Sequence, residues 1–178
     1  LEIEGGVQNC DPNLVWGCNF SIRKELLIAA NGFHPDGMPK ELIRFRGDGE
    51  THVSRFVAKT GMKTIFHPGA SVFHKVTQER MTFEYFRQRG FNHGISDSFT
   101  NLRSQKSGEL AQQHRLISVF KPILRGLRDL GSRIRIPSDT RRALTELKLG
   151  YSAGWKYHQE AYYGDPEVHD WVHQSKYY

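Results

Sequence analysis

The sequence predicts an α/β fold for residues 1–95, followed by a basic α-helical extension over residues 96–178. The apolar stretch LVWGCNFSI at 14–22 alternates in part, as a strand does, and a short helical pattern follows it. Two further apolar stretches, 63–66 and 71–76, flank a Pro-Gly turn and predict short strands. Beyond residue 95 the pattern changes to that of helices, which places the extension there.

Length and composition are those of a folded protein with room for one domain and an extension. The chain has 178 residues, of which 38% are hydrophobic and 25% are charged. No apolar run approaches the roughly 18 residues of a membrane span, and LEIEGGVQNC lacks the pattern of a signal peptide. Cys10 and Cys18 are too few for a disulfide scaffold, although a bridge between them is an alternative. We therefore expect a reduced, cytoplasmic protein.

Positive charge is concentrated in one part of the chain. Residues 103–148 contain eleven Lys or Arg and four acids, whereas the whole chain has a net charge of +6. A basic segment suits an anionic partner, which here is a membrane surface, a phosphorylated substrate or nucleic acid. Nucleic acid is disfavoured because the segment has no recognised nucleic-acid motif. We expect peripheral contact with the inner face of a membrane; the alternative is an ordinary solvated helix face.

Helix signals are clearest where an apolar stripe has both a start and a stop. Apolar residues at i, i+3 and i+4 after Asp48 predict a helix that begins there and ends at Gly61. Asp48 is also one of the best residue types for capping a helix. Further helices are predicted at 23–32, from Thr82, across 108–131, from Ser138 or Asp139 to Tyr163, and from Pro166 with Asp165 as its cap.

One face of the helix that ends at Tyr163 is aromatic. Its members recur at i, i+4, i+7 and i+11, and they are Tyr151, Trp155, His158 and Tyr162. A stripe of this kind is more often core than binding surface. We expect it to pack the helices of the extension together or against the α/β unit.

Three segments occur in an order that resembles the motif order of a known family. They are VWGCNFSIRKELLIAANGF, GDGETHVSRFVAKTGMKTIFHPGASVFH and FEYFRQRGFNHG. Together they resemble the second half of a family 2 glycosyltransferase of the GT-A fold. In that family a Gly-small-Asn strand leads into an Arg-bearing helix, and an acidic motif at a helix start, a Pro-containing turn and an aromatic-His strand end follow.

The resemblance implies a partial GT-A-like sheet and a transferase activity. The enzyme would move a sugar from a nucleotide-diphosphate donor, with inversion, to a glycan or lipid-linked acceptor, as in the biosynthesis of bacterial cell-surface polysaccharides. The family also has a nucleotide-binding half with an Asp-x-Asp motif, which this chain lacks. We expect the chain to be incomplete as an enzyme on its own. The alternatives are a non-catalytic basic module that binds membrane or nucleic acid and a pseudoenzyme scaffold; a homo-oligomer is compatible with each.

Two acids, Asp48 and Glu50, are the catalytic candidates. Inverting transfer needs a base that takes the acceptor hydroxyl proton as attack proceeds. The resemblance places an acid at this helix start in that role, which implies Glu50. The family more often has adjacent Glu and Asp here, whereas Gly49 separates the two acids in this chain. Asp48 is either a helix cap or a second catalytic acid, and Glu50 alternatively favours only the positive end of the helix.

The remaining candidates bind substrate or metal. The resemblance implies that His74 completes the coordination of a divalent cation on the diphosphate, Mn²⁺ or Mg²⁺, and an imidazole ligand favours Mn²⁺. It also places residues 16–19 near the sugar, although Trp16 is alternatively a core residue. Arg87 and Arg89 are candidates for diphosphate contacts or are solvated helix residues. The four residues near the sugar are Trp16, Gly17, Cys18 and Asn19.

Overall fold

The chain is mostly helical, so the predicted α/β sheet of the GT-A type is wrong. The computed structural model describes residues 6–15, 17–106 and 137–177. Within this part of the chain the only sheet is an antiparallel ribbon of two strands, β1 (Gln8–Asn9) and β2 (Ile65–Phe66), in which Gln8 lies opposite Phe66. Both strands are exposed on both faces, so the ribbon does not form a core.

The two other predicted strands are replaced by turns and coil. The 14–22 stretch overlaps two 3₁₀ turns, η1 (Pro12–Leu14) and η2 (Gly17–Asn19). Asp11 begins the first of these turns by accepting a hydrogen bond from the Asn13 amide at 2.9 Å. Residues 71–76 are exposed coil and pair with no strand among the described residues. A strand is stable only beside a hydrogen-bonded neighbour, and no described residue provides one for these stretches.

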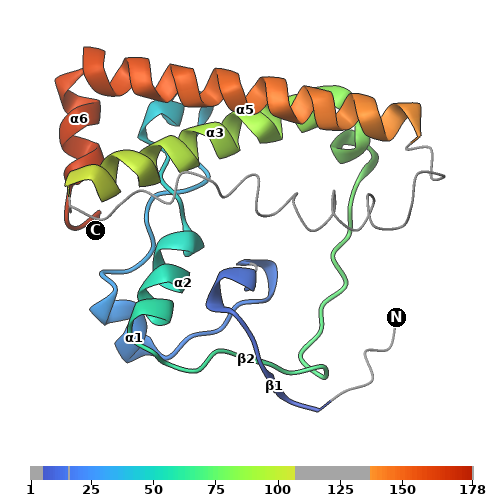
Figure 1. Cartoon of the computed structure of the whole chain (residues 1–178), viewed down its shortest axis with the longest axis vertical. Helices are drawn as coiled ribbons and strands as arrows, with labels where there is room; N and C mark the ends of the chain where they lie inside the picture. The colour runs from blue at the N-terminus through green and yellow to red at the C-terminus, as the bar shows by residue number, and fades with distance from the viewer. Residues whose placement is uncertain (1–5, 16, 107–136, 178) are drawn as a thin grey trace. The chain divides into compact units, whose positions relative to one another are not determined.

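The chain divides into two compact units, each of which is described by itself. The first unit comprises Leu1–Thr77 together with His173–Tyr178, and the second comprises Gln78–Val172. The helix α3 (Phe83–Lys106) runs through residue 95, where the sequence placed its boundary. Figure 1 shows the elements along the chain.

The first unit contains α1 (Lys24–Ala29), the 3₁₀ helix η3 (Lys40–Phe45) and α2 (Glu50–Lys59). The predicted helix after Asp48 is confirmed as α2, since its apolar stripe buries Val53 and Val57. It stops where predicted, because Gly61 has a φ of +68°, a left-handed conformation that glycine adopts without strain.

The second unit contains η4 (Gln78–Met81), α3, α5 (Ser138–Gly164) and α6 (Pro166–His173). The predicted starts of α3 and α6 are confirmed: the Thr82 hydroxyl accepts from the Tyr85 amide at 3.1 Å, and Asp165 accepts from the Glu167 amide at 3.0 Å.

The other helix predictions in this region have mixed outcomes. The extent of α5 is confirmed, but neither Ser138 nor Asp139 caps it, because the helix follows Pro137 directly and has no side-chain cap. The helix predicted across 108–131 lies outside the described residues. Of the helices that are described, none has the length and apolarity needed to cross a membrane.

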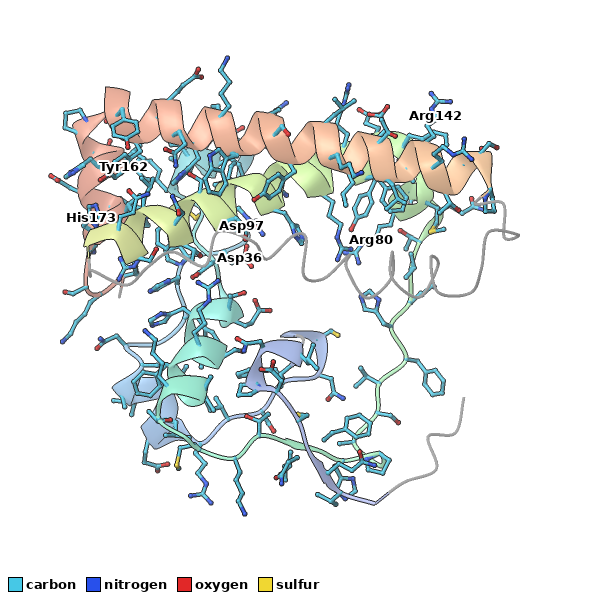
Figure 2. All side chains as sticks on the ribbon, viewed as in Figure 1. Asp36, Arg80, Asp97, Arg142, Tyr162 and His173 are labelled. Atoms are coloured by element: carbon cyan, nitrogen blue, oxygen red, sulfur yellow. The ribbon has the colours of Figure 1, made fainter. Side chains whose placement is uncertain are left out.

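Helices α3 and α5 lie side by side and run in the same direction (Figure 1). Figure 2 shows Arg142 near the start of α5 and Tyr162 near its end. Glycines at the same spacing on each helix, GFNHG (90–94) and GYSAG (150–154), form the contact. A methyl group on Gly94 would lie 2.2 Å from the Tyr151 carbonyl oxygen, and one on Gly154 would lie 2.0 Å from that of Phe91. The two backbones therefore touch, as small residues permit.

The aromatic face of α5 packs within the helical unit, as predicted. His158 is fully buried, and its Nδ1 lies 2.8 Å from the buried Ser98 hydroxyl. Tyr151 donates to Asp97 at 3.2 Å, and burial together with this carboxylate raises the Tyr151 pKa. The buried apolar side chains among the described residues of this unit are Ile95, Phe99, Leu102, Val168 and Val172.

The free energy of unfolding is expected to fall in acid because of His158. Burial removes the His158 ring from water and lowers its pKa from 6.5 to about 4. Between these two values the unfolded chain binds more protons than the folded one, so stability decreases as pH falls. Urea denaturation at pH 7.5 and pH 4 should differ by about 3 kcal/mol from this residue alone. The same comparison in His158→Gln should show that difference removed; an unchanged difference would assign it to other groups.

Candidate functional site

Glu50 lies at the first turn of α2 with its carboxylate against the backbone of Gly17. A methyl group on Gly17 would lie 1.7 Å from Glu50 Oε1, so the carboxylate occupies the space that a side chain at position 17 would need. Glu50 is partly exposed and makes no hydrogen bond or ion pair with any described residue. The lone pairs of this carboxylate are open to water or to a ligand. Two of the predicted site residues are thus brought together.

Asp48 has a different environment from Glu50, and its predicted role as a helix cap is wrong. The residue at the capping position of α2 is Gly49, which has no side chain to donate or accept. The Asp48 side chain is 7% exposed and lies 2.7 Å from His34 Nδ1 and 3.4 Å from Arg55 Nη1. These two partners offset the cost of burying the carboxylate. Asp48 is therefore held within the protein, while Glu50 reaches the surface.

Gly49 can only be glycine in this structure. Its φ is +51° and its ψ is −127°, a combination that side chains disfavour. A methyl group there would also lie 2.8 Å from Asp36 Oδ2. Asp36 is itself held by an ion pair with Arg46 and by the Gly37 amide at 2.7 Å. The separation of the two acids by a glycine thus has a structural cause.

A second histidine lies against the first. The rings of His34 and His52 stack with centroids 3.7 Å apart and an interplanar angle of 17°. His52 Nε2 lies 2.7 Å from the Ala30 carbonyl oxygen, which only accepts, so this nitrogen carries a proton. The ring of Tyr177, near the end of the chain, lies edge-on to the His34 ring, with the two ring centroids 5.6 Å apart.

The other residues predicted near the sugar are only partly described. Trp16 lies outside the described residues. Cys18 is exposed and, like Cys10, is a free thiol, so the alternative of a bridge between them is wrong. The Asn19 amide donates to the Ala70 carbonyl at 2.5 Å, which ties η2 to the turn before residues 71–76.

The predicted metal ligand does not form a metal site with described residues. His74 is exposed, and no group of three His, Cys, Asp or Glu side chains suited to a metal occurs in the described ranges. A Mn²⁺ or Mg²⁺ site would need oxygen ligands beside it, and the described residues do not supply them. The metal role of His74 stays a prediction.

The predicted phosphate-binding arginines lie on α3 in the second unit. Arg87 Nε forms an ion pair with Glu146 Oε2 at 2.9 Å, which joins α3 to α5. Arg89 is exposed and remains a candidate. Most of the basic segment 103–148, for which a membrane contact was predicted, falls in 107–136 and lies outside the described residues.

The sequence did not single out His34 or Asp36. Both occur in FHPDGMPKE, which the proline and glycine content marked only as a loop. No spacing rule relates His34 to Asp48, fourteen positions away in the chain, so their ion pair requires the fold to be known. A His and an Asp flanking a proline in a long loop were the only available signal.

Comparisons of the chain with protein-family models, with curated proteins and with solved structures find no match.

Proposed function

We propose that this chain carries the acceptor side of an inverting glycosyltransferase, with Glu50 as the general base. The observation that supports this most is the contrast between the two acids. The Asp48 carboxylate is buried and paired, whereas the Glu50 carboxylate is partly exposed, unpaired among the described residues and next to the small Gly17. A base must meet its substrate, and of these two acids Glu50 is the more accessible one.

The reaction assigned to Glu50 is a single displacement. The acceptor hydroxyl oxygen attacks the anomeric carbon of the donor sugar, and Glu50 takes the hydroxyl proton. The bond from the anomeric carbon to the diphosphate oxygen breaks, and the nucleoside diphosphate leaves with the electron pair. Attack from the side opposite the leaving group inverts the anomeric configuration. The acceptor in this proposal is a glycan or a lipid-linked sugar.

Acceptor-dependent release of a nucleoside diphosphate tests this function. The full-length gene product is incubated with a panel of nucleotide sugars, glycan and lipid-linked acceptors, and Mn²⁺ or Mg²⁺. We expect release with at least one donor, and NMR of the product should show an inverted anomeric centre. Folded protein that releases nothing with any donor would count against the proposal, as would a product with retained configuration.

Gly17→Ala is expected to lower turnover about 100-fold without unfolding the protein. The added methyl group would overlap Glu50 Oε1, and the flexible glutamate side chain would move aside to relieve the overlap. The thermal midpoint should therefore change little while the base loses its position. Gly6→Ala is the matched control, because no atom lies within 4 Å of a methyl group there. Equal turnover in the two variants would show that the position of Glu50 against Gly17 does not matter.

A further inference from the structure

Three consecutive loop residues contact the three residues that precede α2, residues 47–49, which we call the acidic turn. His34 pairs with Asp48, the Pro35 carbonyl accepts the Gly47 amide at 2.6 Å, and Asp36 lies against Gly49. Asp36, labelled in Figure 2, also forms an ion pair with Arg46, the residue just before the turn. Each residue of the loop segment thus contacts one residue of the other segment. We name residues 34–36 the HPD clamp.

We propose that the HPD clamp positions Glu50, with His34 as the positioning residue that holds Asp48 and through it the turn from which Glu50 projects. This inference rests on the proposed function for its consequence in catalysis, but not for its geometry. In this proposal His34 contacts neither the substrate nor any reacting atom. The clamp acts by limiting the directions in which the Glu50 carboxylate can point.

Burial makes His34 the decisive member of the clamp. The side chains of His34 and Asp48 are each 7% exposed, so the hydrogen bond between them is shielded from water. Asp36 is 40% exposed, and its ion pair with Arg46 is accordingly weaker. Only one residue, Gly49 with its unusual backbone angles, separates Asp48 from Glu50 in the chain. A shift of Asp48 is therefore passed to Glu50 directly.

Further contacts keep the His34 ring in place. His52 lies on the first turn of α2 and stacks on one face of His34, while its own Nε2–H is held by Ala30. Tyr177 approaches the ring edge-on. The ring thus has neighbours on α2 and at the C-terminal end of the chain, and its Nδ1–H points at Asp48.

The geometry is tested first without any substrate. NMR spectra are compared for the wild type, His34→Leu, His34→Asn and the control His93→Leu, which alters an exposed histidine on α3. The Asn side-chain amide can replace the Nδ1–H donor, whereas Leu cannot. We expect His34→Leu to shift the Glu50 side-chain carboxyl signal and the Gly17 amide signal, and both His34→Asn and His93→Leu to leave them near their wild-type positions.

Two NMR results would overturn the inference. One is that His34→Leu leaves both signals unchanged in a folded protein, and the other is that His34→Asn shifts them as far as His34→Leu does. If His34→Leu alone does not fold because Asp48 is left buried without this partner, the double variant His34→Leu, Asp48→Asn replaces it. The same shifts are expected there, with the Asp48→Asn single variant as reference.

Kinetics give the second test, in the full-length protein. His34→Leu should lower kcat about 100-fold and change KM less than about threefold, because a displaced base affects the chemical step more than binding. His34→Asn should recover most of kcat. A change in KM alone would overturn the positioning role. A wild-type protein that transfers no sugar would count against the proposed function only, since the NMR comparison still decides whether His34 positions Glu50.

Discussion

Glu50→Gln is expected to lower acceptor-dependent turnover about 1000-fold while the protein remains folded. Glutamine has the size of glutamate and can still lie against Gly17, but it cannot accept the acceptor proton. The stability should change little, since the Glu50 carboxylate makes no ion pair among the described residues and is partly exposed. Initial rates of nucleoside diphosphate release, measured with saturating donor and acceptor, provide the comparison.

Two further variants distinguish loss of the general base from the effect of removing a negative charge elsewhere. Glu25→Gln removes an exposed glutamate from the first turn of α1, the same kind of position that Glu50 has on α2, and should leave turnover unchanged. Asp48→Asn should lower both turnover and stability, because it weakens the buried contacts with His34 and Arg55. Full activity in Glu50→Gln together with loss in Asp48→Asn would assign the base to Asp48 and contradict the proposed role.

Helices could be predicted from this sequence because their signals are local. The stripe of α2 with Gly61 as its stop, the Thr82 start of α3 and the Asp165 cap of α6 all occur within a few residues of the helix they define. The strand predictions were borne out only at 63–66, which contains β2, and the two others were wrong for the opposite reason. Residues 14–22 and 71–76 have strand-like composition, but a strand also needs a neighbour, and sequence composition does not say whether one is there.

The candidate site could be predicted only in part for a similar reason. The resemblance brought Gly17 and Glu50 onto the list of site residues, and the structure places them in contact. Asp48 at the end of a loop looked like a cap because capping is local, yet its side chain binds His34, which the sequence marked only as part of a loop. Rules based on neighbouring residues do not predict the partner of a buried acid when that partner is distant in the sequence.

The glycines at the contact between α3 and α5 recur at the same spacing in the sequence, but that spacing does not by itself predict a contact. Gly90 and Gly94 have the same spacing as Gly150 and Gly154, sixty residues later. Each has backbone of the other helix within 2.2 Å of where a methyl group would lie. Spacing alone does not show which helices meet, so the contact could not be inferred before the fold was known.

Gly154→Ala is expected to destabilise the protein by about 4 kcal/mol. Alanine is intrinsically the better helix former by about 1 kcal/mol, so any loss must come from the contact. The methyl group would lie 2.0 Å from the Phe91 carbonyl oxygen, and a backbone atom cannot move aside as a side chain can. Gly164→Ala is the control, since no atom lies within 4 Å of a methyl group there. Urea denaturation followed by circular dichroism measures both variants.

The double variant Gly94→Ala, Gly154→Ala distinguishes helix separation from local strain. A methyl group on Gly94 would lie 3.1 Å from the Gly154 carbonyl carbon, so the two sites are in direct contact. Once α3 and α5 have moved apart to admit one methyl group, the second meets less resistance. The double variant should therefore lose clearly less stability than the two single variants added together. Additive losses, or a Gly154→Ala protein as stable as Gly164→Ala, would contradict a backbone contact between the helices.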